Sequence, residues 1–137
     1  MQIHKLAQTP APAGQTADLK PLFRMHAELC KAMANEHRQA ILHVMCSDEK
    51  CVSDLAAEIG ISVHNVSQHL RVLKERRLVA SRKEGQTVYY HVTNQKFIEA
   101  CALMRQALIE QHQEQGESLQ AAEVLHARPR TTPAASA

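Results

Sequence analysis

The chain has 137 residues and a formal net charge of +2, a length that suits one small domain rather than two. It contains two Phe, two Tyr and no Trp, so the core is expected to be aliphatic, with Met and Cys as fillers. No apolar run approaches the roughly 18 residues that a membrane span needs, and the N-terminus lacks the compact apolar stretch of a secretion signal. We therefore expect a cytoplasmic protein, without a membrane partner, whose four cysteines are thiols.

Both ends of the chain differ in composition from its middle. Residues 1–17 contain Pro10 and Pro12 among small and polar side chains, which predicts a flexible N-terminal arm. Residues 116–137 end in a similar stretch with Pro129 and Pro133 and are expected to form a C-terminal tail. The single folded domain is therefore predicted to span residues 18–115.

Two helices are predicted at the start of this domain. Apolar residues three or four apart predict the first over 18–33, and Pro21 is tolerated in its first turn. The second is predicted over 36–45, with Asn35 as a plausible N-cap. A polar link over 47–50 follows.

The next segment predicts a pair of helices joined by a tight turn. The third helix is expected over 52–58, and Gly60 can end it in a left-handed conformation. Ser62 is a good N-cap for a fourth helix over 63–76. The buried side of that fourth helix is predicted to consist of Val63, Val66, Leu70 and Leu73.

The opposite side of the fourth helix points to a function. An ordinary amphipathic surface helix usually carries Glu and Lys outward, whereas this one carries Ser, Asn, Gln and His. Short hydrogen-bonding side chains on the N-terminal half of a helix can read the edges of DNA bases. The residues on or beside this face are His64, Asn65, Ser67, Gln68 and Arg71.

A β-hairpin is predicted after the fourth helix, with strands over 78–83 and 87–92 and a turn at 84–86. Arg82 and Lys83 lie near its tip, where they could contact phosphate. Between residues 62 and 92 there are six Lys or Arg against two acidic residues. Such a local basic excess favours a polyanionic partner.

A last helix is predicted over 94–115, with its own apolar stripe. A small domain cannot cover the apolar faces of both this helix and the first. We therefore expect a homodimer through the first and last helices, which would present two DNA-reading helices to successive major grooves. The predicted fold class is mainly α (α+β): a winged helix-turn-helix of five helices plus a two-stranded β-hairpin wing.

Three stretches of the chain resemble the ArsR/SmtB family of small dimeric bacterial repressors. They are KAMANEHRQAIL, CVSDLAAEIGISVHNVSQHLRVLKERRLVASRKEGQTVYYHV and the closing amphipathic helix, together covering roughly residues 19 to 112. The resemblance implies a dimer that binds double-stranded operator DNA and releases it when an inducer binds. The DNA contacts that it implies are Ser62, His64, Asn65, Ser67, Gln68, His69 and Arg71 in the helix, and Arg82, Lys83 and Gln86 in the wing.

The resemblance also implies a candidate site for a thiol-reactive inducer such as arsenite, Zn(II) or Cd(II). Many family members carry Cys-Val-Cys-Asp-Leu or Cys-Val-Gly-Asp-Leu at the start of the third helix. Here Cys51 and Asp54 match, and Ser53 replaces the second cysteine. A Cys/Asp pair does not fill a tetrahedral shell, so further ligands, such as Cys46, would have to join it. The family's second metal site, on the last helix, is not expected here, because Asn94 and Lys96 stand where it needs ligands.

An alternative is a repressor that senses oxidants or reactive sulfur through a cysteine pair. Cys46 and Cys101 loosely resemble the pair used by another branch of the family, and Cys46 with Cys51 is a second possible pair. Cys30 and Cys101 lie on apolar stripes, which favours small buried side chains at the dimer interface.

Two other classes of function are compatible with a small domain of this kind. A winged helix can act as a protein–protein interaction module without DNA binding, because a fold does not dictate its function. The polar outward face of the fourth helix argues against that reading. No arrangement of nucleophile, base and orienting group is evident, so an enzyme is not expected.

Overall fold

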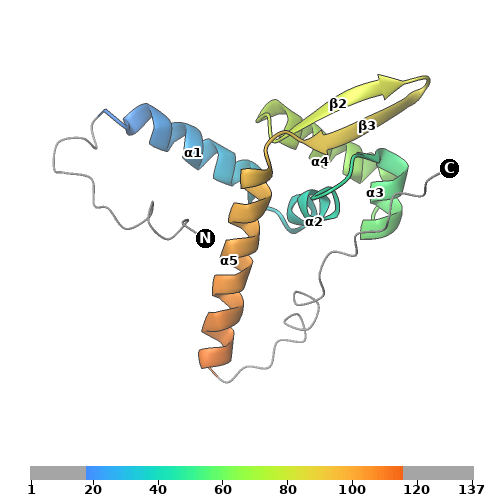
Figure 1. The fold of residues 1–137 in the computed structure, drawn as a ribbon. Helices are drawn as coiled ribbons and strands as arrows, with labels where there is room; N and C mark the ends of the chain where they lie inside the picture. The colour runs from blue at the N-terminus through green and yellow to red at the C-terminus, as the bar shows by residue number, and fades with distance from the viewer. Residues whose placement is uncertain (1–17, 116–137) are drawn as a thin grey trace.

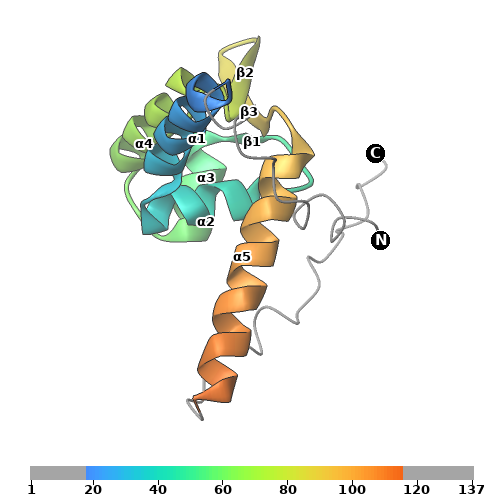
Figure 2. The same ribbon diagram turned by 90° about the vertical axis from the view of Figure 1, so that its left-hand side faces the viewer.

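The computed structural model describes residues 18–115, and the predicted arm and tail lie outside them. The first four helices form the body of the domain, the strands lie along one side, and the last helix extends away from it (Figures 1 and 2). The elements in chain order are α1 Lys20–Met33, α2 Glu36–Val44, β1 Lys50–Cys51, α3 Val52–Ile59, α4 Val63–Glu75, β2 Val79–Glu84, β3 Thr87–Val92 and α5 Gln95–Glu114. The predicted helices and hairpin are confirmed to within one or two residues at each end.

Side-chain caps begin three of the helices. The carboxamide oxygen of Asn35 accepts hydrogen bonds from the backbone N–H groups of His37 and Arg38 at the start of α2. The Ser62 hydroxyl accepts from Asn65 N–H at the start of α4, and Asn94 caps α5 in the same way. Gly60 ends α3 with φ 78°, in the left-handed region. The predicted caps at Asn35 and Ser62 and the stop at Gly60 are therefore confirmed.

Between α4 and β2 the chain reverses direction at Arg77, a non-glycine residue with φ 58°. Arg77 N–H donates to Lys74 C=O at 2.9 Å, and Leu78 N–H donates to Leu73 C=O at 3.0 Å. This pair of bonds is the Schellman pattern, which satisfies carbonyls at a helix end while reversing the chain. It sends the chain from the end of α4 directly into the hairpin.

The sheet has three antiparallel strands in the order β1-β3-β2, so the prediction of a two-stranded wing was incomplete. Lys50 pairs with Tyr90 and Cys51 pairs with Tyr89, which joins the end of the predicted polar link to the hairpin. A two-residue strand carries no alternating pattern, so local sequence could not indicate it. The pairing ties the segment between α2 and α3 to the wing.

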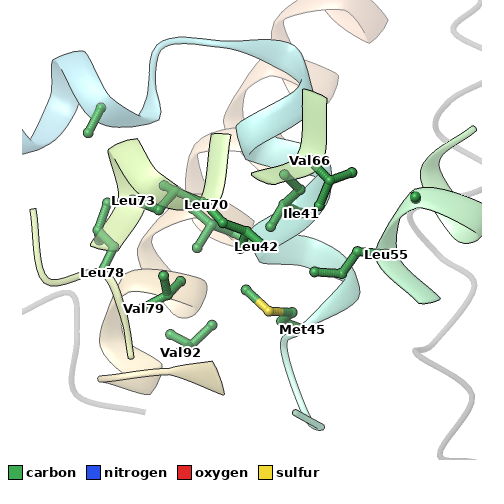
Figure 3. Packing of buried hydrophobic residues seen from close by; sticks show 12 residues of the cluster. Ile41, Leu42, Met45, Leu55, Val66, Leu70, Leu73, Leu78, Val79 and Val92 are labelled. Carbon is green, nitrogen blue, oxygen red and sulfur yellow. The ribbon is translucent and has the colours of Figure 1, made fainter. Parts of the chain in front are cut away.

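The core lies where α2, α3 and α4 meet the base of the hairpin (Figure 3). Its central side chains are aliphatic apart from Met45, as the composition predicted. Val66, Leu70 and Leu73 form the buried side of α4, but the prediction that Val63 joins them was wrong, because its side chain is 52% exposed. Val63 lies in the first turn of α4, and nothing in residues 18–115 covers it there. The fully buried side chains are Ile41, Leu42, Met45, Leu55, Val66, Leu70, Leu73, Leu78 and Val79.

The two outer helices bury little of themselves against this core. Ala32 is the one buried residue of α1 and Cys101 the one buried residue of α5. The lower half of α5 stands clear of the other elements in both views (Figures 1 and 2). Large apolar side chains are consequently exposed on both helices: Leu22, Phe23, Met25, Leu103, Met104 and Leu108. Within the described residues, no helix is long and apolar enough to cross a membrane.

Candidate nucleic-acid interface

No part of residues 18–115 covers the outer face of α4. Val66, Leu70 and Leu73 anchor the helix in the core, so the residues between them are turned outward. Ser62 holds the first turn in place, with its hydroxyl 3.1 Å from Asn65 N. The side chains left exposed are His64, Asn65, Ser67, Gln68 and Arg71. The helix therefore presents hydrogen-bonding groups on a firmly anchored backbone.

His69 is placed differently from its neighbours on α4. It is half-buried, its Nδ1 lies 3.4 Å from Arg38 Nη1, and its ring centroid is 5.5 Å from that of His37. A guanidinium can only donate, so Nδ1 is the acceptor in this contact. Burial lowers the pKa of His69, and the charges of Arg38 and His37 lower it further. His69 thus fastens α4 to α2, and the predicted DNA contact remains a prediction.

Arg38 is a residue that sequence patterns did not single out. Its guanidinium donates to the carbonyl oxygens of Lys31 and Ala32 at the end of α1 as well as contacting His69. It therefore connects α1, α2 and α4. No local motif marks this role, because its three partners come from two other helices.

The two basic residues of the wing lie on opposite faces of the sheet. Arg82 pairs with Tyr89 and Lys83 with Val88, and successive residues of a strand point to opposite sides. Ser81 shares the face of Lys83 and accepts a hydrogen bond from Lys74 Nζ of α4 at 2.7 Å. Lys83 therefore projects from the face that is turned toward α4, and Arg82 from the other.

The ionic environments of these side chains also differ. Arg82 donates to both Glu49 and Glu84, and its guanidinium carbon lies 4.8 Å from the centre of the Tyr89 ring. Lys83 is exposed and forms no ion pair within residues 18–115. Arg71, on α4, is also exposed and unpaired within that range, which leaves both side chains available to phosphate. Gln86 is exposed in the turn beside Gly85, which has φ 61°.

The candidate sensing residues belong to different elements of the fold: the link between α2 and α3, the start of α3, and α5. Cys51 is half-buried at the N-cap of α3, with its Sγ 3.2 Å from Ser53 Oγ, and Asp54 is exposed in the first turn of that helix. Cys46 is also half-buried, near Ser47. Cys101 is buried on α5, where burial raises the pKa of its thiol, Arg105 lowers it and Cys30 raises it.

Within residues 18–115 no group of three or more His, Cys, Asp or Glu side chains could hold a metal ion. A structural metal site for a soft ion needs about four such ligands, so the residues of one subunit do not complete the predicted shell. Cys30 is exposed in the single chain, so its expected burial depends on a partner.

Comparison with known proteins places the chain in a family. Residues 35–81 match the family described as "Bacterial regulatory protein, arsR family". The uncharacterized HTH-type transcriptional regulator Rv0081 of Mycobacterium tuberculosis is 30% identical over 90 residues, which cover 65% of this chain and 79% of that protein. The chain belongs to the ArsR family. As a member of this family of bacterial regulatory proteins, it is a transcription regulator rather than an enzyme.

Further relatives are named for different regulatory roles. The transcriptional activator HlyU of Vibrio cholerae is 42% identical over 66 residues, covering 48% of this chain and 61% of that protein. The cadmium resistance transcriptional regulatory protein CadC of Listeria innocua is 41% identical over 69 residues, covering 50% and 58%.

A solved structure confirms the predicted fold class. The homodimeric winged helix-turn-helix DNA-binding domain of Mb0332 from Mycobacterium bovis superposes with a TM-score of 0.62 at 31% identity. The match covers 75% of this chain and 94% of that one. The ArsR-family chain described here therefore has a winged helix-turn-helix fold, with a third short strand at the base of its wing.

Proposed function

We propose that this ArsR-family regulator is a homodimeric repressor that binds operator DNA and is released by a thiol-reactive inducer. The observation that carries the proposal is the outer face of α4, where five polar side chains are exposed on a helix anchored by three buried ones. Such a helix fits the major groove and can hydrogen-bond to base edges. The proposed base and phosphate contacts are Ser62 at the N-cap of α4, His64, Asn65, Ser67, Gln68 and Arg71 in α4, and Lys83 and Gln86 in the wing.

Dimerisation is proposed through α1 and α5. Their exposed apolar side chains would be covered by a second copy of the chain, and Mb0332 is described as homodimeric. A two-fold axis would place two α4 helices about one DNA turn, roughly 34 Å, apart. Binding two half-sites with one rigid dimer explains how a small domain could select an operator.

Repression is proposed as the direction of control. The named relatives include an activator, HlyU, so the direction has to be measured for this chain. Transcription in vitro from the chain's own promoter should fall when the protein is added and recover when an inducer releases it. A rise in transcription on adding the protein would refute repression while leaving DNA binding intact.

The inducer is proposed to act at the segment around Cys51, with Asp54 and Cys46 as neighbours. CadC, a relative, is named for cadmium resistance, which supports a soft metal ion or arsenite. Because one subunit does not supply a full set of ligands, others would have to come from the second subunit or from residues beyond 18–115. The alternative is a redox pair, and the half-buried thiols of Cys46 and Cys51 favour this pair over one that includes the buried Cys101.

DNA binding is tested by fluorescence anisotropy with the chain's own promoter DNA. Gln68→Ala and Arg71→Ala should each weaken binding by about 1–3 kcal/mol if the side chain contacts a base. Gln113→Ala, at an exposed position near the end of α5, is the matched control and should bind like the wild type. Unchanged affinity in both α4 variants would rule out this face as the DNA-reading surface.

Release is tested in the same assay with arsenite, Zn(II), Cd(II) and a persulfide donor. Release by arsenite or a metal that is lost in Cys51→Ser would place the inducer at Cys51. Release only by the persulfide donor, reversed by a reductant, would favour the redox pair, and comparison of Cys51→Ser with Cys101→Ser would identify its members. A Cys51→Ser protein that responds fully to every inducer would exclude Cys51.

A protein–protein module is the second candidate, and salt concentration separates the two. Binding to DNA releases counterions, so affinity should fall steeply as salt rises. Retention of DNA affinity in high salt, or no affinity in low salt, would speak against the proposed function.

A further inference from the structure

Arg82 is exposed but contacts three side chains: Glu84 and Tyr89 of the hairpin, and Glu49 of the link before β1. Its Nε lies 2.9 and 3.0 Å from the two carboxylate oxygens of Glu49, and its Nη2 also bonds to Glu49. Its Nη1 donates to Glu84 at 2.8 Å, and its guanidinium lies over the ring of Tyr89. A forked bond to one carboxylate, combined with stacking on an aromatic ring, holds a guanidinium in one orientation.

The sheet register shows what these contacts connect. Cys51 pairs with Tyr89, and Tyr89 pairs with Arg82, so the three residues form one row across β1, β3 and β2. Paired residues of antiparallel strands project from the same face. Glu49, just before β1, reaches along this face to Arg82 on the far strand. The Glu49–Arg82 clasp therefore joins the link between α2 and α3 to the wing.

The charges around Arg82 oppose a direct role in binding phosphate. The carboxylates of Glu49 and Glu84 already bond to the single positive charge of Arg82. Together these three side chains carry a net negative charge. A phosphate approaching Arg82 would meet both carboxylates and would have to displace one of them. Lys83 is exposed on the face turned toward α4 and forms no ion pair among the described residues, so it presents no such obstacle.

We infer that Arg82 is a positioning residue: the Glu49–Arg82 clasp fixes the orientation of the wing, and Lys83 on the opposite face makes the phosphate contact. This inference rests on the proposed binding of operator DNA. It also means that the segment 49–51 contacts the wing in two ways: β1 pairs with β3, and Glu49 bonds to Arg82.

The sign of the effect of Glu49→Gln distinguishes positioning from phosphate binding. If the clasp positions the wing, Glu49→Gln should weaken operator binding by about two- to fivefold, the range expected for losing an exposed ion pair. Arg82→Gln should have a similar effect, and the double variant should be no weaker than either single variant. If Arg82 instead binds phosphate, Glu49→Gln frees it and tightens binding, which would overturn the inference.

Two further variants distinguish the effect of the positive charge at position 82 from the effect of the forked bond to Glu49. Arg82→Lys keeps the positive charge but lacks the fork, so it should bind DNA as weakly as Arg82→Gln. Lys83→Gln should reduce the slope of log affinity against log salt by about 1, whereas Arg82→Gln should leave that slope unchanged. Wild-type affinity for Arg82→Lys, or a lower slope for Arg82→Gln, would make Arg82 a phosphate contact.

Asp48→Asn is the matched control, because it removes one negative charge from the same link without touching Arg82. It should not weaken binding; a loss equal to that of Glu49→Gln would refute the clasp. Thermal melting of each variant separates loss of the fold from loss of wing orientation.

A measurement without DNA tests the clasp even if the proposed function fails. Amide hydrogen exchange at the tip, residues 83–87, should be faster in Glu49→Gln and in Arg82→Lys than in the wild type or Asp48→Asn. Unchanged exchange in both clasp variants would show that the wing is held by other contacts. If the variants show this exchange pattern but the wild-type protein binds no DNA, the proposed function is refuted and the clasp is not.

Discussion

The hydroxyl of Ser62 caps the helix that is proposed to read DNA, and its removal should cost measurable stability. It accepts a hydrogen bond from Asn65 N–H at 3.1 Å and satisfies one of the donors at the start of α4. Ser62→Ala leaves that donor without its partner and should lower the free energy of unfolding by about 1 kcal/mol. For a domain of about this size, such a loss lowers the melting temperature by about 4–8 °C.

The same position also separates stability from DNA binding. Aspartate caps a helix about as well as serine, and its negative charge suits the positive end of the helix dipole. Ser62→Asp should therefore melt at or above the wild-type temperature. It should nevertheless bind operator DNA more weakly by about 1–3 kcal/mol, because the carboxylate would repel a phosphate at the start of α4.

The assays are thermal melting followed by circular dichroism at one fixed protein concentration, and fluorescence anisotropy on promoter DNA. Fixed concentration matters because dimerisation contributes to apparent stability. Asn35→Asp is the control: it adds the same charge at the N-cap of α2, where Asn35 accepts from His37 N–H and Arg38 N–H. It should retain both stability and most of its affinity. The reasoning is refuted if Ser62→Ala melts like the wild type, or if Ser62→Asp binds DNA as well as Asn35→Asp does.

Three further predictions concern stability and its dependence on pH. Leu70→Ala should destabilise the protein by about 2–5 kcal/mol in chemical denaturation, because Leu70 is fully buried; a loss well below this range would show that the core collapses around the gap. Arg77→Gly should raise the unfolding free energy by about 0.5–1 kcal/mol, because glycine adopts φ 58° without the steric cost of a Cβ. A lower unfolding free energy would mean that the Arg77 side chain stabilises the fold by more than its backbone conformation costs. Stability should also fall as pH decreases below 6.5, the ordinary pKa of histidine. Burial and the charges of Arg38 and His37 lower the pKa of His69 in the folded state. The unfolded chain therefore takes up a proton before the folded chain does, and protonation favours unfolding. Melting between about pH 8 and pH 5 should therefore show a smaller decrease in His69→Gln than in the wild type, and an equal decrease would exclude His69 as a source.

Much of the fold follows from local signals in the chain. Asn35 and Ser62 are good N-caps, Gly60 accepts a left-handed backbone, and Val66, Leu70 and Leu73 recur at helical spacing. Each of these signals depends on residues that lie within about two helical turns of each other. Such short-range preferences act before tertiary contacts form, which is why they could be read from residues alone.

The details of the wing could not be predicted in this way. Sequence placed Arg82 and Lys83 together near the hairpin tip, but the register turns them to opposite faces. Glu49 lies 33 positions before Arg82 along the chain, and only the folded sheet brings the two together. His69 likewise matched its neighbours by residue type, but packing against Arg38 turns it toward α2.

By itself, the sequence determined the order of the helices, their caps, the hairpin and the polar outer face of α4. These features depend on hydrophobic periodicity and backbone preferences, which are properties of neighbouring residues. Only the tertiary structure decided that β1 joins the sheet, that Arg82 is paired with Glu49 and Glu84, and that Lys83 forms no ion pair with any residue of the described range 18–115. The physical reason is that an ion pair or a strand pairing depends on distance in space, and residues far apart in the chain acquire that distance only when the core closes.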